Sequence, residues 1–336
     1  MSLAASILAG DRLALSRLLT LVENNDPQGL EALNELFPHT GRAHLIGVTG
    51  APGTGKSSLV NRLVLHYRRQ VQPAPRVAVI AVDPSSPFSG GAVLGDRVRM
   101  RDLSGDSGVF IRSMASRGSL GGLAQTTAAL AQVFDAAGYE IIFIETVGAG
   151  QNEVDIARLA HTTLVVEAPG LGDDIQAIKA GILEIADILV INKADRPGVE
   201  STEKALKNML ELAHPLRRVF RHHGRIEVIE APSTAPEYNS WIPPIHRTVA
   251  TEGKGIPELV ESIARHRQHL LESGDWQARE RARLQAELED LLRETLLRQF
   301  RSRIAPQTYE QVLQQVLERS LSPWEAIHLL TNRRQG

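Results

Sequence analysis

A glycine-rich segment, GAPGTGKSS at residues 50–58, has the residue types and the spacing needed to bind phosphate groups. Glycines at positions 53 and 55 let main-chain N–H groups turn toward phosphate oxygens, and a helix that begins at Lys56 would add the positive end of its dipole. We predict that Lys56 contacts the β- and γ-phosphates and that the hydroxyl of Ser57 ligates Mg²⁺. The predicted phosphate-binding residues are Gly50, Gly53, Thr54, Gly55, Lys56, Ser57 and Ser58.

Three carboxylates in the middle of the chain could complete a hydrolytic site. Asp83 ends an apolar run, Asp96 lies in a glycine-containing loop, and Glu145 directly follows the apolar run Ile141–Ile144. A single Asp of this kind can equally be a turn former or a helix cap. Taken together with Lys56, the three acids predict a catalytic site in which carboxylates hold metal-bound waters and orient the attacking water. Because Glu reaches about one C–C bond farther than Asp, Glu145 suits action through a metal-bound water.

The segment NKAD at residues 192–195 predicts guanine recognition. An Asp carboxylate at position 195 can accept hydrogen bonds from the ring N–H and the exocyclic amine of guanine, a donor pair that adenine does not present. We expect Asn192 to tie loops together and the aliphatic stem of Lys193 to cover the base. In a third segment, HRTVATEGKG, the backbone N–H of Ala250 is predicted to reach the guanine carbonyl, although an ordinary turn into a helix would look the same.

The segment GAGQNE, which follows Glu145 after a short turn, is predicted to be a switch. Gly148 would face the γ-phosphate, and the residues up to Glu153 would move when that phosphate is lost. Arg117 and Gln151 are candidates for a residue that accelerates hydrolysis, but spacing alone assigns neither of them.

Short apolar runs separated by helical segments must position these residues. Runs that are continuously apolar indicate strands covered on both faces, so the sequence predicts an α/β fold with a mostly parallel sheet. The expected strands are Leu45–Thr49, Val77–Val82, Val109–Ile111, Ile141–Ile144, Thr163–Val166, Ile188–Ile191 and Ile226–Ile229. We expect an N-terminal helical arm at 1–40, a P-loop domain at 41–265 and a C-terminal helical extension at 266–336.

The C-terminal extension carries an apolar stripe at helical spacing. Its members are Leu284, Leu288, Leu291, Leu292, Leu296 and Phe300. Such a stripe either packs on its own domain or forms a contact between two chains, and the stripe alone leaves both open. Two further helices are expected at 307–319 and 323–331.

The composition excludes several classes of protein. The 336 residues carry a formal net charge of −2 and no Cys, which argues against nucleic-acid binding, disulfides and thiolate metal sites. The N-terminus lacks a basic region before its short apolar start, and no apolar run approaches the roughly 20 residues that span a bilayer. We therefore expect a cytoplasmic protein with no membrane partner.

In combination, these motifs resemble the methylmalonyl-CoA mutase-associated GTPase family, the MeaB or ArgK type, also labelled LAO/AO transport-system kinase. The resemblance rests on GAPGTGKSS, AVDPSSPFSGGAVLGDRVRM, RGSLGGLA, ETVGAGQNE, PGLGDDIQAIKAGILEIADILVINKAD and PPIHRTVATEGKGI, and covers nearly the whole chain. It implies a GTPase of the signal-recognition and partitioning class that forms a homodimer through its C-terminal helices. It also implies a chaperone that gates cofactor loading into an adenosylcobalamin-dependent acyl-CoA mutase and protects that enzyme.

The resemblance carries residue roles as well. It implies that Lys56 and Ser57 hold phosphate and Mg²⁺, that Asp83, Asp96 and Glu145 serve hydrolysis, and that Asn192, Lys193 and Asp195 read guanine. A nucleotide-sensing segment that faces the partner corresponds to residues Asp173, Asp174, Gln176 and Lys179. Glu167, Leu171 and Asp174 depart from the commonest family pattern, which leaves the GTPase assignment intact but puts the identity of the mutase in doubt.

Two other functions stay open at this point. A metallochaperone GTPase for a nickel enzyme would share the fold, but it needs Cys/His clusters, and this chain has no Cys and one adjacent His pair, His222-His223. A transport-system protein kinase would need an acceptor-binding element that the sequence does not display. The chain also lacks the Asp-x-His-x-x-Gly signature of base-off cobalamin binding, so the cobalamin is expected on the partner.

Overall fold

The computed structural model describes residues 1–84, 101–103, 105–116, 122–146, 153–170, 185–213, 218–222, 225–229 and 241–332. These residues divide into two compact units, Met1–Arg283 and Leu284–Gly336. The first unit contains all the residues that the sequence predicts to bind nucleotide, together with the N-terminal arm.

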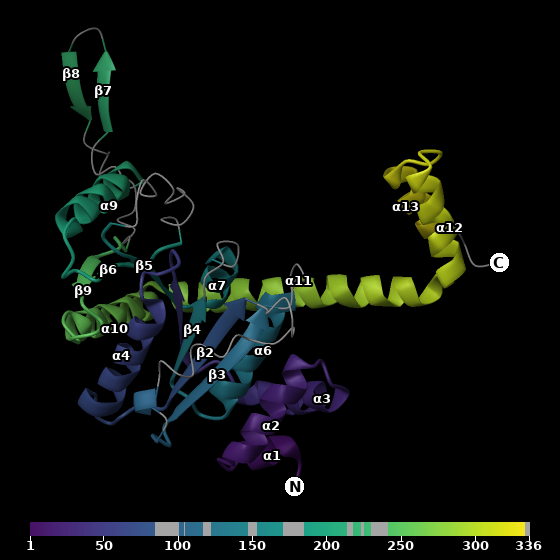
Figure 1. The fold of residues 1–336 in the computed structure, drawn as a ribbon, viewed down its shortest axis with the longest axis horizontal. Helices are drawn as coiled ribbons and strands as arrows, with labels where there is room; N and C mark the ends of the chain where they lie inside the picture. Colours follow the sequence, from purple (N-terminus) through teal and green to yellow (C-terminus); the bar gives the residue numbers. More distant parts are fainter. Residues whose placement is uncertain are drawn as a thin grey trace. The chain divides into compact units, whose positions relative to one another are not determined.

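A seven-stranded parallel sheet forms the centre of the first unit, in the order β3-β2-β4-β1-β5-β6-β9 (Figure 1). The prediction of a mostly parallel sheet is therefore confirmed. All of its loops that are expected to bind nucleotide follow the carboxyl ends of strands, where open parallel sheets bind their ligands. The strands are β1 (His44–Thr49), β2 (Val77–Pro84), β3 (Val109–Ser116), β4 (Ile141–Thr146), β5 (Thr162–Glu167), β6 (Ile188–Asn192) and β9 (Ile245–Thr248).

The seventh strand of the sheet is not the one that the sequence predicts. Ile226–Ile229 does form part of a strand, β8 (Arg225–Ile229), but β8 pairs antiparallel with β7 (Arg218–His222) in a separate two-stranded ribbon. The sheet instead ends with β9, which pairs with β6. An edge strand of four residues, IHRT, that is only partly buried has no continuous apolar run, so hydrophobic pattern could not reveal it.

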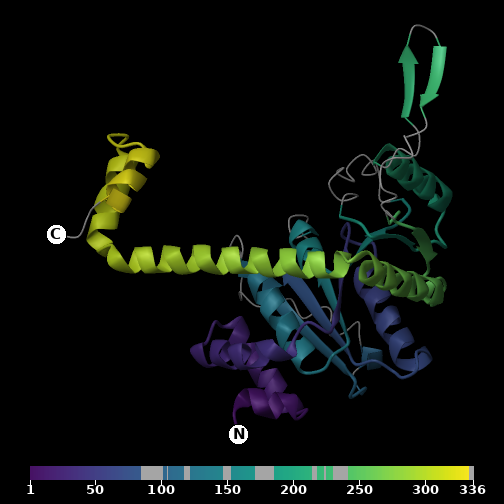
Figure 2. The same ribbon diagram turned by 180° about the vertical axis from the view of Figure 1, so that it is seen from behind.

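Helices cover both faces of the sheet, as Figures 1 and 2 show from opposite sides. The helices α4 (Lys56–Gln70) and α10 (Ile256–Ser273) pack on one face, where Ile46 and Val48 of β1 point. The neighbouring Leu45 points to the other face, because successive side chains of a strand alternate. That face is covered by α6 (Gly122–Ala136), α7 (Glu153–Leu159) and α9 (Val199–Ala213).

The N-terminal arm forms a further layer on α6. It consists of α1 (Leu3–Leu8), α2 (Arg12–Glu23) and α3 (Pro27–Leu36), followed by a short 3₁₀ turn, Phe37–His39. Asp11 caps α2 by accepting hydrogen bonds from two backbone N–H groups, and Asp26 caps α3 in the same way. Leu18 and Leu19 of α2 are fully buried against Leu130 and Phe134 of α6 and Ile80 of β2 in one cluster.

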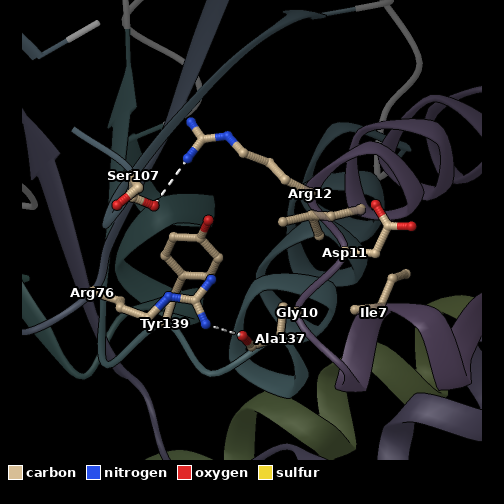
Figure 3. A pocket seen from close by; sticks show the side chains of 9 residues that line it. Ile7, Gly10, Asp11, Arg12, Arg76, Ser107, Ala137 and Tyr139 are labelled. Carbon is tan, nitrogen blue, oxygen red and sulfur yellow. Dashed lines mark hydrogen bonds between the residues drawn. The ribbon is translucent and has the colours of Figure 1, made fainter. Parts of the chain in front are cut away.

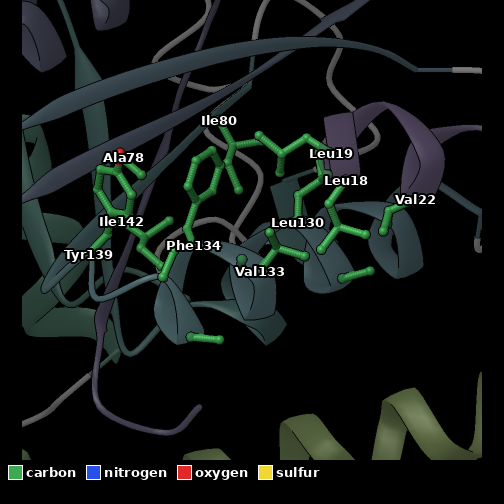
Figure 4. Close-up of a cluster of buried hydrophobic side chains, with 14 of the residues drawn as sticks. Leu18, Leu19, Val22, Ala78, Ile80, Leu130, Val133, Phe134, Tyr139 and Ile142 are labelled. Carbon is green, nitrogen blue, oxygen red and sulfur yellow. The ribbon is translucent and has the colours of Figure 1, made fainter. Parts of the chain in front are cut away.

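Arg12, at the start of α2, also fastens the arm to the sheet. Its two terminal nitrogens donate to the carbonyls of Ser107 at 3.0 Å and Val109 at 2.7 Å, beside a small cavity that Figure 3 shows. On the far side of this cavity, Arg76 donates to the carbonyl of Ala137 and lies over the ring of Tyr139. Both guanidinium groups are thus engaged by main-chain oxygens. The buried cluster between arm, helix and sheet appears in Figure 4.

Two polar pairs, Asp187 with Arg279 and Glu280 with His161, join the amino ends of β5 and β6 to the start of α11 (Asp275–Arg303); we call them the polar clasp. Asp187 accepts from the N–H of Thr163 at 2.8 Å and receives both terminal nitrogens of Arg279 at 2.8 Å. Although burial opposes ionisation, nearby His266 and the fork of Arg279 lower the pKa of Asp187 to about 2. A second pair, His161 with Glu280 at 2.6 Å, lies next to the first.

Two buried histidines in or next to the polar clasp, His161 and His44, have lowered pKa values. Burial lowers the pKa of His44 well below its ordinary value and lowers that of His161 as well, although Glu280 opposes the second shift. The ring of His161 accepts from the N–H of Leu45 through Nδ1, so its proton lies on Nε2, facing Glu280. Its ring also stacks on Trp276 at 3.8 Å.

The second unit contains the rest of α11 with α12 (Pro306–Leu317) and α13 (Pro323–Asn332). Five leucines of the predicted stripe are exposed: Leu284, Leu288, Leu291, Leu292 and Leu296. Among the described residues, no helix is both long enough and apolar enough to cross a bilayer.

Candidate nucleotide-binding site

The predicted phosphate loop lies between the end of β1 and the start of α4, and close packing requires glycine at two of its positions. At Gly50, where φ is +136°, a Cβ atom would lie 2.0 Å from the carbonyl oxygen of Val166 in β5. At Gly55, where φ is +91°, a Cβ atom would lie 2.6 Å from the side-chain nitrogen of Asn192. Gly53, with φ of +80°, has open space instead. The loop is therefore pressed against β5 and β6.

Lys56 is the first residue of α4, and its side chain folds back over the loop. Its Nζ atom donates to the carbonyls of Gly50 at 2.7 Å and Ala51 at 3.1 Å, and the residue is 6% exposed. The ammonium group is thus held at the mouth of the loop by two main-chain oxygens. At this position the Lys56 ammonium group can bind phosphate oxygens of a nucleotide that occupies the loop.

Ser57 and Glu145 are in direct contact. The Ser57 hydroxyl donates to Glu145 Oε1 at 2.6 Å, and both residues are buried, with Glu145 only 1% exposed. Register explains the meeting: β1 pairs with β4, and Val48 is the partner of Glu145. When the hydroxyl donates its proton to the carboxylate, its oxygen lone pairs stay available. A hydroxyl and a carboxylate are hard oxygen donors, so this pair fits Mg²⁺.

The other two predicted carboxylates are only partly placed. Asp83 lies in β2, two positions beyond Ala81, which is the register partner of Glu145. Its backbone therefore reaches the same edge of the sheet, while its side chain lies outside the described part of the structure, as does the whole of Asp96.

Asn192 joins three loops at the end of β6. Its side-chain nitrogen donates to the carbonyl of Thr54 in the phosphate loop at 2.8 Å. Its side-chain oxygen accepts from the hydroxyl of Thr248 at 3.2 Å and from the N–H of Ala250 at 3.1 Å. The expectation that Asn192 ties loops together agrees with these contacts, which bring the phosphate loop and the predicted base-binding loops to one place.

The two other residues of the NKAD segment lie beside this junction. Lys193 has a positive φ of 58°, and its Nζ atom donates to the carbonyl of Gly53 at 2.5 Å. Asp195 is exposed, so its carboxylate is accessible from solvent. Ala250 is 4% exposed, and its N–H donates to Asn192, so this amide would have to be shared with a guanine carbonyl or released to it.

Several predicted residues lie outside the described residues. They are Asp96, Arg117, Gly148, Gln151, Asp173, Asp174, Gln176 and Lys179. The switch segment and the partner-sensing segment therefore stay predictions. Ser58, by contrast, is the third residue of α4, on the helical turn that closes the phosphate loop.

A family model described as "Methylmalonyl Co-A mutase-associated GTPase MeaB" matches residues 15–305. This chain belongs to that family of GTPases. The match includes the phosphate loop, Glu145 and the NKAD segment. The recognition from sequence motifs is thereby confirmed, and so is the assignment of GTP hydrolysis as the activity.

Named relatives agree with the family. This GTPase is 36% identical over 332 residues to "GTPase ArgK" of Escherichia coli, covering 96% of this chain and 92% of the relative. It is 31% identical over 348 residues to "Methylmalonic aciduria type A homolog, mitochondrial" of Mus musculus, covering 98% of this chain and 78% of the relative. A crystal structure titled "LAO/AO transport system kinase" is 28% identical, with a TM-score of 0.68, and covers 98% of this chain and 95% of that one.

Sequence reasoning missed two features of the GTPase site. The direct contact between Ser57 and Glu145 depends on the register of β1 and β4, which no motif states. Arg62, on α4, donates to the carbonyls of Ala250 and Thr251. An arginine within a helix carries no sequence signal for such a contact.

Proposed function

We propose that this GTPase is a chaperone of an adenosylcobalamin-dependent acyl-CoA mutase, with methylmalonyl-CoA mutase as the first candidate. It gates loading of the cofactor into the mutase and protects that enzyme from inactivation. The match of a mutase-associated GTPase family over residues 15–305 carries this proposal. The mouse relative, whose name refers to methylmalonic aciduria, supports it.

In the proposed site, each part of GTP has its own set of residues. Lys56 and the loop amides bind the β- and γ-phosphates, and Ser57 with Glu145 holds Mg²⁺. Bound Mg²⁺ neutralises the charge that develops on the phosphate oxygens. Asp83 and Asp96 complete the carboxylate set and orient the attacking water. Asp195 and the N–H of Ala250 bind guanine, and the stem of Lys193 covers it.

The hydrolytic part of the proposal is tested with Glu145→Ala. Because the phosphate loop and the base-binding segment stay intact, we expect GDP to bind with a Kd within about threefold of the native value. Turnover should fall by at least about 100-fold, because Ser57 loses its carboxylate partner at the metal position. Glu211→Ala, at an exposed position of α9, is the matched control. Native turnover in Glu145→Ala would contradict the assignment.

The partner is tested with purified mutases. GTP turnover of the full chain is measured alone and with stoichiometric apo-mutase acting on methylmalonyl-CoA, 2-hydroxyisobutyryl-CoA or another short acyl-CoA. We expect one mutase to change the turnover and its own cofactor loading to become GTP-dependent. No change with any of these mutases would count against the chaperone role.

We also propose that the second unit mediates homodimerisation. The support is the exposed leucine stripe, in which Leu288 is 67% and Leu292 is 55% exposed. Such surfaces in soluble proteins commonly mark contacts between proteins. Sedimentation should give a dimer for the native chain and a monomer for Leu288→Lys/Leu292→Lys, while Glu289→Lys, on the same helix, should stay a dimer. A monomeric native chain would refute the assignment.

The segment with Asp173, Asp174, Gln176 and Lys179, together with Gln151, is proposed to sense the nucleotide and to face the mutase. Substitutions there should change the effect of the mutase on turnover more than they change turnover of the GTPase alone.

A further inference from the structure

Arg62 reaches from the phosphate-binding helix to the loop that follows β9. It lies six residues after Lys56 on α4, about 9 Å along the helix axis. Its Nε atom donates to the carbonyl of Ala250 at 2.8 Å, and its Nη2 atom donates to the carbonyl of Thr251 at 2.6 Å. Two donors of one planar guanidinium fix the direction of a contact as well as its position.

These contacts hold two successive peptide groups. Because each peptide group is planar and trans, fixing the Ala250 carbonyl also fixes the plane that carries the N–H of Thr251. Fixing the Thr251 carbonyl does the same for the N–H of Glu252, which donates to Val249 at 3.0 Å. The N–H of Ala250 itself belongs to the preceding peptide group, which Asn192 holds. Arg62 therefore fixes the peptide group after Ala250 and Asn192 the one before it, so the backbone at Ala250 is restrained on both sides.

Other contacts restrain the same loop from different directions. The N–H of Val249 donates to the carbonyl of Lys254 at 3.0 Å, which closes the loop on itself. Asn192 receives the N–H of Ala250 from the side of β6. Arg62 adds the connection to the helix that starts at the phosphate loop, so one rigid element spans the binding positions of the phosphates and the base.

We infer that Arg62 is a positioning residue for guanine recognition, which holds the Ala250 loop so that its amide meets the guanine carbonyl. This inference rests on the proposed role of Ala250 in base binding. Arg62 lies outside the NKAD segment. Its loss should weaken recognition of the guanine carbonyl by Ala250 and leave recognition of the exocyclic amine by Asp195 unchanged.

Two nucleotide analogues separate the two edges of the base. In 6-thio-GDP, sulfur replaces the carbonyl oxygen and accepts hydrogen bonds weakly, so comparison with GDP reports the contact with Ala250. IDP keeps that carbonyl but lacks the exocyclic amine, so comparison with GDP reports the contact with Asp195. A variant that merely loosens the fold would weaken all three nucleotides by the same factor.

The experiment measures Kd for GDP, 6-thio-GDP and IDP on the full chain, with melting temperatures as a check on folding. For Arg62→Gln we expect the Kd for GDP to rise about fivefold, the size of one lost hydrogen bond. The preference for GDP over 6-thio-GDP should shrink by a similar factor, while the preference for GDP over IDP stays native. Arg62→Lys, which keeps a charged donor group but loses the planar pair of N–H donors, should lie between the native chain and Arg62→Gln. Arg69→Gln, which removes the same charge from an exposed position of α4, should behave like the native chain.

Three results would overturn the inference. The first is a native Kd for GDP in Arg62→Gln. The second is weaker binding of GDP, 6-thio-GDP and IDP by the same factor, which would indicate a general loss of structure. The third is an Arg62→Gln variant that binds GDP more weakly but still prefers GDP over 6-thio-GDP as strongly as the native chain does. A native chain that did not prefer GDP over IDP would instead refute guanine reading by Asp195, so failure of the proposed site is recognisable by itself.

Discussion

Replacing Asn192 is expected to disconnect the phosphate loop from the base-binding loop. The residue is 2% exposed and makes three hydrogen bonds of 3.2 Å or shorter, with Thr54 at 2.8 Å, Ala250 at 3.1 Å and Thr248 at 3.2 Å, besides a long one to the Gly55 carbonyl at 3.5 Å. At about 1 kcal/mol for each hydrogen bond lost, Asn192→Ala should lower the free energy of unfolding by about 3 kcal/mol. For a unit of this size the melting temperature should then fall by about 6–12 °C.

The orientation of the amide gives a sharper version of this prediction. The Thr54 carbonyl can only accept and the Ala250 N–H can only donate, so the side-chain nitrogen must face Thr54. Asn192→Asp keeps the shape and both acceptor contacts, but it places a carboxylate oxygen against the Thr54 carbonyl. We therefore expect Asn192→Asp to be at least as destabilising as Asn192→Ala, despite its smaller change in size.

The assay is thermal unfolding of the full chain at pH 7, followed by measurement of Kd for GDP. Both variants should bind GDP at least about tenfold more weakly, because the two loops lose their common tether. Asn208→Ala, at an exposed position of α9, is the control and should melt like the native chain. A native melting temperature for Asn192→Asp would refute the assigned orientation, and one for Asn192→Ala would refute the tether itself.

Two further predictions concern other parts of the first unit. Asp187 and His44 both have lowered pKa values in the folded protein. As the pH falls below the ordinary pKa of each group, 3.8 for Asp187 and 6.5 for His44, the unfolded chain binds a proton more readily than the folded one, so stability is lost. Unfolding measured from pH 7 to pH 2 should show a first loss of stability below pH 6.5 and a second, of about 2 kcal/mol by pH 2, that begins below pH 4 and that Asp187→Asn should abolish. Stability that is constant over this range would contradict the prediction. Gly50→Ala would place Cβ 2.0 Å from the Val166 carbonyl and should prevent folding, whereas Gly53→Ala, which meets open space, should cost about 1–2 kcal/mol. Equal soluble yields and melting temperatures for the two would disprove the packing argument.

The elements that hold the site were predictable because their chemistry is local. Gly50, Gly55, Lys56 and Ser57 form a loop whose spacing is set by the phosphates it binds, and continuous apolar runs indicate a parallel sheet with both faces covered. Six of the seven strands of the sheet, and the family, follow from such signals alone. The expectation that Asn192 joins neighbouring loops also rests on its motif, and its contacts with Thr54 and Ala250 agree with it.

Contacts that depend on register or on long separation in the chain were not predictable. Glu145 meets Ser57 because β1 and β4 are neighbours in the sheet, although 88 residues separate them. Arg62 meets the Ala250 loop across 188 residues. The edge strand β9 was missed for a different reason, because its four residues, three of them polar, show no continuous apolar run that could outweigh the stronger β-type run at Ile226–Ile229.

Strand β6 connects two sites that lie at its opposite ends. Asp187, which accepts hydrogen bonds from Arg279 of α11, directly precedes the strand. Asn192, which donates to the carbonyl of Thr54 in the phosphate loop, is the last residue of the strand. Five extended residues span only about 17 Å. The strand therefore links the two sites directly. If the first turns of α11 shifted along β6, either the hydrogen bonds between Arg279 and Asp187 would break or the strain would pass along β6 toward Asn192.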